Sequence, residues 1–83
     1  MSNIDYSRLR SLTARRLVQA LLDEGFFLVR QRGSHRRYAN SDGRRVTVPF
    51  TRSGDTFAPG TLRSMIETQA HWSAQDLERL RLL

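Results

Sequence analysis

The fold is decided by residues 26–49, FFLVRQRGSHRRYANSDGRRVTVP, in which two turn signals separate three runs of strand-forming residues. The first run is aromatic and β-branched at its start and basic at its end, and Gly33 after it marks a bend or a bulge. Asn40-Ser41-Asp42-Gly43 is a hairpin signal, because Asp-Gly suits the positive φ angles of tight hairpin turns. The predicted strands are Phe26–Arg32, Ser34–Ala39 and Arg44–Val48, the last ended by Pro49.

Helical patterns flank these strands on both sides. Thr13 is a suitable N-cap, the leucines after it recur at helical spacing, and Gly25 ends the helix, which we place at Ala14–Glu24. After a polar loop, Pro59-Gly60-Thr61 opens a second helix with Thr61 as its cap. Its expected inward stripe is Leu62, Met65, Ile66 and Gln69. Ser73-Ala74-Gln75-Asp76 predicts the start of a short last helix that carries Leu77, Leu80 and Leu83.

These elements predict an α+β fold of the order α-β-β-β-α, with a short C-terminal helix added. Three antiparallel strands can bury one face beneath the two main helices and leave the other face open. Successive side chains of a strand point to opposite faces, and Tyr38 is the residue of the middle strand that we expect to be buried. Ser34 and Arg36 then share its face, whereas His35 and Arg37 face solvent.

The length of 83 residues and the hydrophobic content of 39% predict one small domain. We divide the chain into an N-terminal extension, residues 1–12, and a single domain, residues 13–83. In the extension, Ile4, Tyr6 and Leu9 are candidates for packing on the domain. The sequence lacks cysteine, which excludes disulfides and zinc–thiolate sites. It also lacks a long apolar run and a signal-peptide core, so we expect a cytoplasmic protein without membrane contact.

The charge is strongly positive and concentrated. The net charge is +6, and the fourteen basic residues are all arginine. Six of them fall in a segment that holds one acid, Asp42: Arg30, Arg32, Arg36, Arg37, Arg44 and Arg45. Clustered positive charge indicates a polyanionic partner, with nucleic acid favoured over an anionic membrane and over a merely solvated surface.

One histidine, His35, lies within this arginine cluster. Guanidinium groups bind phosphate, and an imidazole moves protons near neutral pH. The acids are scattered without ligand spacing, so we expect no metal site. A lone histidine hardly activates water for DNA hydrolysis, whereas RNA carries its own nucleophile, the 2′-hydroxyl. The cluster therefore predicts metal-independent RNA cleavage that leaves a 5′-hydroxyl and a 2′,3′-cyclic phosphate, or the 3′-phosphate from its opening.

Several alternatives stay open at this point. A lone histidine on a strand is more often an ordinary residue than a catalytic one, so a non-catalytic RNA-binding module is the main alternative. A DNA-binding regulator is less favoured, because the second helix offers only Arg63 for groove contacts. The sequence also leaves open whether His35 is the acid or the base, and whether an arginine, a hydroxyl or the substrate carries the second proton.

Several segments of the sequence, taken in their order along the chain, resemble those of one known family. Arg30-Gln31-Arg32-Gly33-Ser34-His35 is followed by Tyr38, Asp42-Gly43, Val46-Thr47-Val48-Pro49 and Pro59-Gly60-Thr61-Leu62-Arg63-Ser64-Met65-Ile66. In order and spacing these segments resemble the HicA toxin family over residues 13–70. The resemblance implies a fold similar to a double-stranded-RNA-binding domain. It further implies the toxin of a type II toxin–antitoxin system, an mRNA endonuclease in which His35 is catalytic, and a HicB-like antitoxin partner that covers the active face.

The chain departs from the family pattern in two places. Many members carry a histidine shortly after the Val-Pro pair, where this chain has Thr51. If that histidine assists catalysis in relatives, this protein is slower or relies on another group. Ala70-His71-Trp72-Ser73 replaces a glycine-containing turn, which we expect to change only the turn.

The resulting site predictions are specific. His35 is the predicted catalytic residue, and the predicted RNA-binding residues are Arg32, Gly33, Ser34, Arg36 and Arg37. Gly33 would let the backbone approach the substrate, and Ser34 would orient His35 or contact a phosphate. Arg30, Arg44 and Arg45 are second choices for phosphate binding. We expect no cofactor and no metal, with RNA and the antitoxin as partners.

Overall fold

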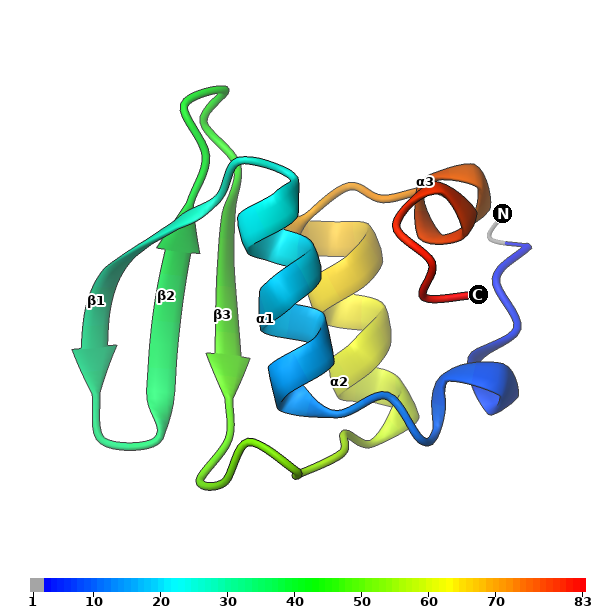
Figure 1. Ribbon diagram of the computed structural model, residues 1–83, viewed down its shortest axis with the longest axis horizontal. Helices are drawn as coiled ribbons and strands as arrows, with labels where there is room; N and C mark the ends of the chain where they lie inside the picture. The colour runs from blue at the N-terminus through cyan, green and yellow to red at the C-terminus, as the bar shows by residue number, and fades with distance from the viewer. Residues whose placement is uncertain (1–2) are drawn as a thin grey trace.

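The computed structural model describes residues 3–83 and confirms the α+β fold (Figure 1). A three-stranded antiparallel sheet is preceded by one main helix and followed by another, and a short helix ends the chain. The elements are the 3₁₀ turn η1 (Tyr6–Leu9), α1 (Ala14–Asp23), β1 (Phe27–Arg32), β2 (His35–Ala39), β3 (Arg45–Pro49), α2 (Pro59–Arg63), its continuation η2 (Ser64–Gln69) and α3 (Ala74–Arg79).

The strands follow one another across the sheet in the order β1-β2-β3. A two-residue turn, Gly33–Ser34, joins β1 to β2 and sets Arg32 opposite His35. Gly33 has a φ of +57°, which a two-residue hairpin turn with glycine at its first position requires of that glycine, so the predicted bend is confirmed. The irregularity of the sheet lies elsewhere, in β1, where the register shifts between Leu28 and Arg30 and leaves Val29 as an extra residue.

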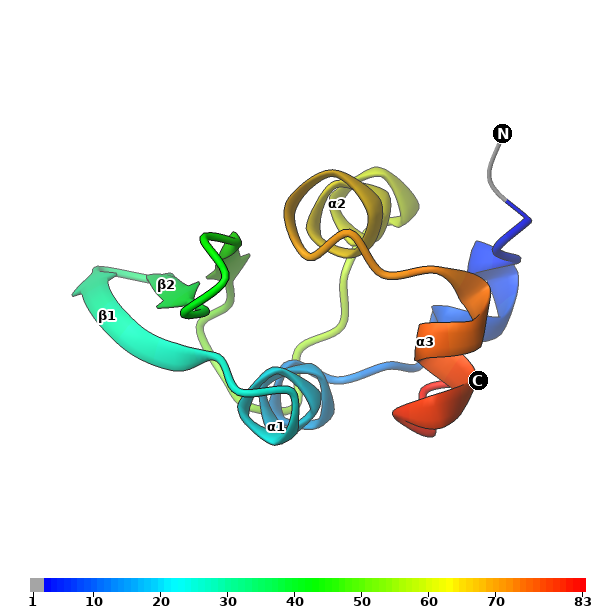
Figure 2. The ribbon, with the colours of Figure 1, turned by 90° about the horizontal axis from the view of Figure 1, so that it is seen from above.

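The sheet buries one face against the helices. Tyr38, Val46 and Val48 are buried there, as predicted for Tyr38, and they join a core that contains Leu62, Met65 and Ile66 of the second main helix. Burying a side chain of this size contributes about 1.5–3 kcal/mol. The helices lie on the β3 side of the sheet and β1 lies at its far edge (Figures 1 and 2).

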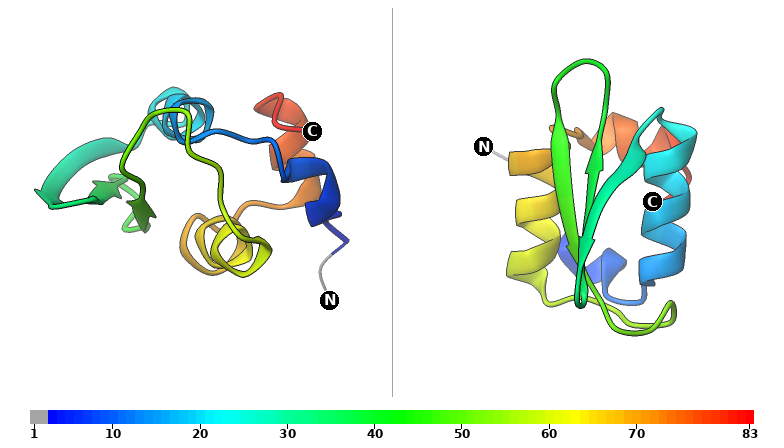
Figure 3. Two further views of the ribbon diagram at one scale, coloured as in Figure 1. Left: turned by 90° about the horizontal axis from the view of Figure 1, so that it is seen from below. Right: turned by 90° about the vertical axis from the view of Figure 1, so that its left-hand side faces the viewer.

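This arrangement leaves β1 outside the core. Every residue of β1 is exposed, in contrast to the alternating burial of β3. Viewed from the β1 side, the strands stand in front of the space between α1 and α2 (right panel of Figure 3). The core therefore supports β2 and β3 directly and supports β1 only through its pairing with β2.

The helix ends were predicted with mixed success. The Thr13 hydroxyl accepts a hydrogen bond from the Arg16 amide (3.2 Å), and Ser73 and Asp76 form a capping box, as predicted. The prediction of Thr61 as a cap is wrong, because α2 already begins at Pro59. The fixed φ of proline suits the first position of a helix, and proline has no amide hydrogen that would need a capping partner. The helix then widens into a π-helical stretch over Ser64–Gln69, which periodicity alone did not predict.

The N-terminal segment packs on the helices. Tyr6, Leu9 and Leu12 are buried in the same core, and Ile4 packs against it, so the expected contacts of Ile4, Tyr6 and Leu9 are confirmed. The Tyr6 hydroxyl donates a hydrogen bond to the carboxylate of Glu67. Burial and this bond raise the pKa of Tyr6 above its usual value.

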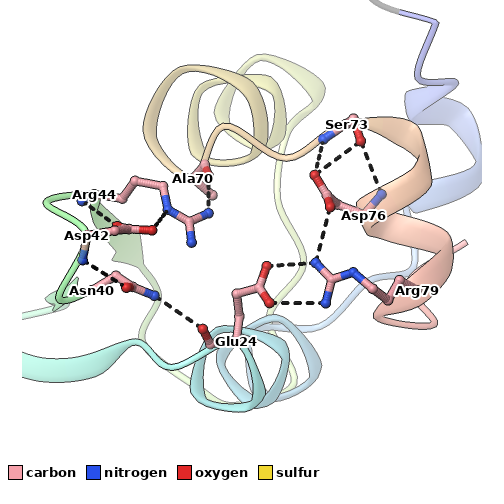
Figure 4. Close-up of polar contacts among 8 residues, drawn as sticks. All are labelled: Glu24, Asn40, Asp42, Arg44, Ala70, Ser73, Asp76 and Arg79. Atoms are coloured by element: carbon pink, nitrogen blue, oxygen red, sulfur yellow. Dashed lines mark hydrogen bonds and ion pairs between the residues drawn. The ribbon is translucent and has the colours of Figure 1, made fainter.

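Polar contacts fasten the C-terminal segment to α1 (Figure 4). The Arg79 guanidinium donates two hydrogen bonds to Glu24 (3.1 and 2.8 Å) and one to Asp76 (3.1 Å). Hydrogen bonding from Arg79 holds the pKa of Glu24 below its usual value, and the Ser73 amide does the same for Asp76. At the other end of α1, Arg16 donates to the carbonyl of Leu80 (2.6 Å). Next to this network Trp72 is buried in the core and meets the ring of Phe26 edge to face.

Candidate nucleic-acid interface

The open face of the sheet carries a hollow that contains the predicted histidine. Its volume is about 260 Å³, and it is lined by Arg30, Arg32, His35, Arg37 and Thr47. The strand register explains this grouping, because residues paired across neighbouring strands share a face. Arg30, Arg37 and Thr47 form one row across the sheet, and Arg32 and His35 form the next. We call these five residues the basic hollow.

Within the described residues, the arginines of the basic hollow have no acidic partners. The ion pairs found within residues 3–83 engage Arg44, Arg63 and Arg79, and none engages an arginine of the hollow. The three arginines of the hollow are exposed, and so is His35. Three unneutralised guanidinium groups around one imidazole make a surface that attracts a multiply charged anion such as a phosphodiester.

The other predicted site residues lie outside the hollow. Gly33 and Ser34 form the turn at the end of the strands that bear His35 and Arg32. Arg36 pairs with the buried Val48, and its guanidinium carbon lies 4.6 Å from the centroid of the Phe50 ring. This stacking, on the face of Tyr38, separates Arg36 from the hollow.

The second-choice arginines Arg44 and Arg45 differ from each other in their contacts. Arg44 donates hydrogen bonds to Asp42 (2.8 Å) and to the carbonyl of Ala70 (2.7 Å), and it stacks on the Phe26 ring at 4.9 Å (Figure 4). These contacts tie the hairpin turn to the end of the second main helix. Arg45 is exposed at the start of β3. Of the second choices, only Arg30 joins His35.

Sequence reasoning did not select Thr47 as a site residue. Its neighbours Val46 and Val48 are both buried, so alternation alone would have placed Thr47 on the open face. The Thr47 amide donates a hydrogen bond to the side-chain oxygen of Gln69 (2.7 Å), and the Gln69 amide nitrogen in turn donates to the Ser64 hydroxyl (2.9 Å). The π-helical stretch thus holds the outer edge of β3 in place beside the hollow.

The position that corresponds to a second histidine in relatives is part of a loop. Thr51 is exposed, and its amide donates to the Asp55 carboxylate (2.9 Å), as does the amide of Arg52 (3.0 Å). These backbone hydrogen bonds lower the pKa of Asp55. The loop is anchored to α1 through the Ala14 amide, which donates to the Asp55 carbonyl (2.8 Å).

The described part of the chain has neither a metal-binding cluster nor a membrane-spanning helix. Residues 3–83 contain no cluster of three or more histidine, cysteine or acidic side chains that would hold a metal ion. Among the same residues, no helix has the length and apolar character needed to cross a membrane.

Comparison with known families assigns most of the chain to one of them. Residues 14–72 match the family described as HicA toxin of bacterial toxin-antitoxin. The chain belongs to the HicA toxin family. Comparison with curated proteins gave no match. As a HicA-family chain it is the toxin of a toxin–antitoxin pair, and membership implies an antitoxin partner. The matched segment contains the whole sheet and the second main helix, so the basic hollow lies entirely within the family domain of this HicA toxin.

Proposed function

We propose that this HicA-family toxin is a metal-independent endoribonuclease that cleaves mRNA in the cytoplasm, with the scissile phosphate bound in the basic hollow. The observation that supports the proposal is the position of His35 among three arginines that have no acidic partner within residues 3–83. An exposed imidazole beside unneutralised guanidinium groups provides both requirements of the reaction, proton transfer and charge stabilisation.

The reaction is an internal transphosphorylation. The 2′-oxygen forms a bond to phosphorus as its proton leaves, and the bond from phosphorus to the 5′-oxygen breaks as that oxygen gains a proton. His35 either takes the first proton or gives the second. Arg30, Arg32 and Arg37 stabilise the negative charge that grows on the phosphorane oxygens. Because RNA supplies the nucleophile, no activated water and no cofactor are needed for the cleavage step.

The decisive experiment is cleavage of a defined single-stranded RNA by the wild-type protein in excess EDTA. We expect cleavage to continue, with 5′-hydroxyl ends and 2′,3′-cyclic phosphate or 3′-phosphate ends on the products. A 5′-phosphate end, or activity that returns only when a divalent ion is added, would contradict the mechanism. Binding of the RNA without any cleavage would favour the non-catalytic RNA-binding module.

A matched pair of arginines tests where the RNA lies. Arg36 and Arg37 are neighbours on β2, but only Arg37 lies in the basic hollow. We expect Arg37→Ala to weaken RNA binding and to reduce the slope of log affinity against log salt by about one, since one phosphate contact is lost. Arg36→Ala should leave that slope unchanged, because its guanidinium stacks on Phe50. Filter binding at several salt concentrations measures both, and equal slopes for the two variants would place the RNA elsewhere.

A further inference from the structure

The two outer edges of the sheet differ in whether another element covers them. At the β3 edge, the Thr47 amide donates to the Gln69 side chain, so the edge is covered by the second main helix. At the β1 edge, three consecutive apolar residues, Phe27, Leu28 and Val29, are each about half exposed (51%, 48% and 48%). Exposed edges that carry apolar residues pair readily with other chains, and proteins usually blunt them.

The hydrogen-bond pattern shows which backbone groups of β1 face outward. In an antiparallel ladder, bonded and non-bonded residue pairs alternate. Since the Thr47 amide bonds outward to Gln69, the pair of Arg37 and Thr47 is a non-bonded one, and Arg37 bonds to Arg30 on the other side. Gln31, one residue further along β1, then directs its amide and carbonyl away from β2, toward the open edge.

The positive charge next to the β1 edge favours an acidic chain as the added strand. Arg30 and Arg32 belong to β1 and point into the basic hollow. Side chains of an added strand on that face would lie about 4.5–5.5 Å from theirs, measured between Cβ atoms, and acidic residues are favoured at such positions. A second copy of this chain, with its own charge of +6, would bring two basic hollows together on one continuous sheet face.

We propose that the free edge of β1 binds an extended, acidic segment of the antitoxin as a fourth strand of the sheet. Backbone hydrogen bonds to Gln31 fix the segment, and its apolar side chains cover Phe27, Leu28 and Val29. Its carboxylates reach Arg30 and Arg32 and occupy the positions that phosphates of RNA would take. The inhibitory part of this proposal rests on the proposed function of the hollow, whereas the docking itself does not.

The experiment uses the full chain with its HicB-like antitoxin, co-expressed and purified as a complex. Amide hydrogen exchange over residues 27–32 is compared between the complex and the free toxin. We expect the Gln31 amide to exchange at least about tenfold more slowly in the complex, since it becomes hydrogen-bonded there. Unchanged exchange along β1 would overturn the proposal, and because no RNA is present this result is independent of whether the toxin cleaves RNA.

Two variants at one position test the contact itself. Gln31→Pro removes the outward amide and leaves the bonds to β2, and edge strands tolerate proline. We expect it to weaken the complex by about tenfold and to keep the wild-type rate of RNA cleavage, whereas Gln31→Ala, which retains the amide, should change neither. The wild-type affinity should also fall with added salt. A salt-independent affinity, equal affinities of the two variants, or a free toxin that dimerises through β1 would each contradict an acidic partner strand.

Discussion

Replacing His35 by alanine is expected to reduce RNA cleavage by about 10²–10⁴, which is the usual contribution of a positioned proton-transfer group. RNA binding should remain within about twofold of wild type, because the phosphates are held mainly by the three guanidinium groups of the hollow, whose charge-assisted hydrogen bonds are the strong ones. Initial cleavage rates at saturating RNA, together with binding measured under conditions without turnover, check both parts. The expected result is a large loss in kcat with little change in affinity.

The second histidine provides the matched control. His71 is exposed in the connection between η2 and α3, outside the basic hollow, so His71→Ala should cleave RNA at the wild-type rate. If both variants lose activity equally, the loss has a structural cause and His35 is not catalytic. If His35→Ala loses binding and cleavage together, His35 is an RNA contact and the chain is closer to the non-catalytic module.

Truncating Leu9 to alanine is expected to destabilise the whole domain. Leu9 lies in η1, outside the segment that matches the family, yet it is 1% exposed and part of the core. Large-to-small changes at buried leucines cost about 2–5 kcal/mol, a substantial share of the roughly 5–15 kcal/mol that stabilises a small domain. Urea unfolding followed by circular dichroism measures the loss as a lower midpoint at an unchanged slope.

Ser11 is the control for this variant, since it lies two residues further on and its side chain is exposed. Ser11→Ala should unfold at the wild-type midpoint. A midpoint of Leu9→Ala equal to that of Ser11→Ala would mean that residues 1–12 form a dispensable extension and that the domain of residues 13–83 holds its stability alone.

The order and type of the elements could be predicted because they depend on local patterns. The helical spacing of the leucines in α1, the Asp-Gly turn before β3 and the Ser73–Asp76 box act over a few residues, and each is found in the structure. Pro59 is a local signal of the same kind for the start of α2, although Thr61 was predicted as the cap. The π-helical stretch could not be predicted in this way, because no motif of a few residues marks it.

The candidate site was predictable only in part, for a related reason. Alternation from Tyr38 placed His35 and Arg37 on the open face and Arg36 on the other. Which residues from other strands join His35 depends on register, which is set by the length of the Gly33–Ser34 turn and by the extra residue in β1. Arg30 enters the basic hollow through that register, whereas Thr47 enters it through the pairing of β3 with β2, which the turn after Asn40 sets. Alternation within a strand assigns each residue a face but does not say which residue of the neighbouring strand lies beside it.

The extra residue Val29 has an effect on the charge of the two faces. Leu28 pairs with Tyr38 on the helix side, so strict alternation from Leu28 would send Arg30 and Arg32 to that side as well. One inserted position reverses the phase of the strand, and both guanidinium groups emerge beside His35 instead. One extra residue in β1 thus keeps both arginines off the face that packs on the helices. That face stays apolar, and the open face becomes cationic.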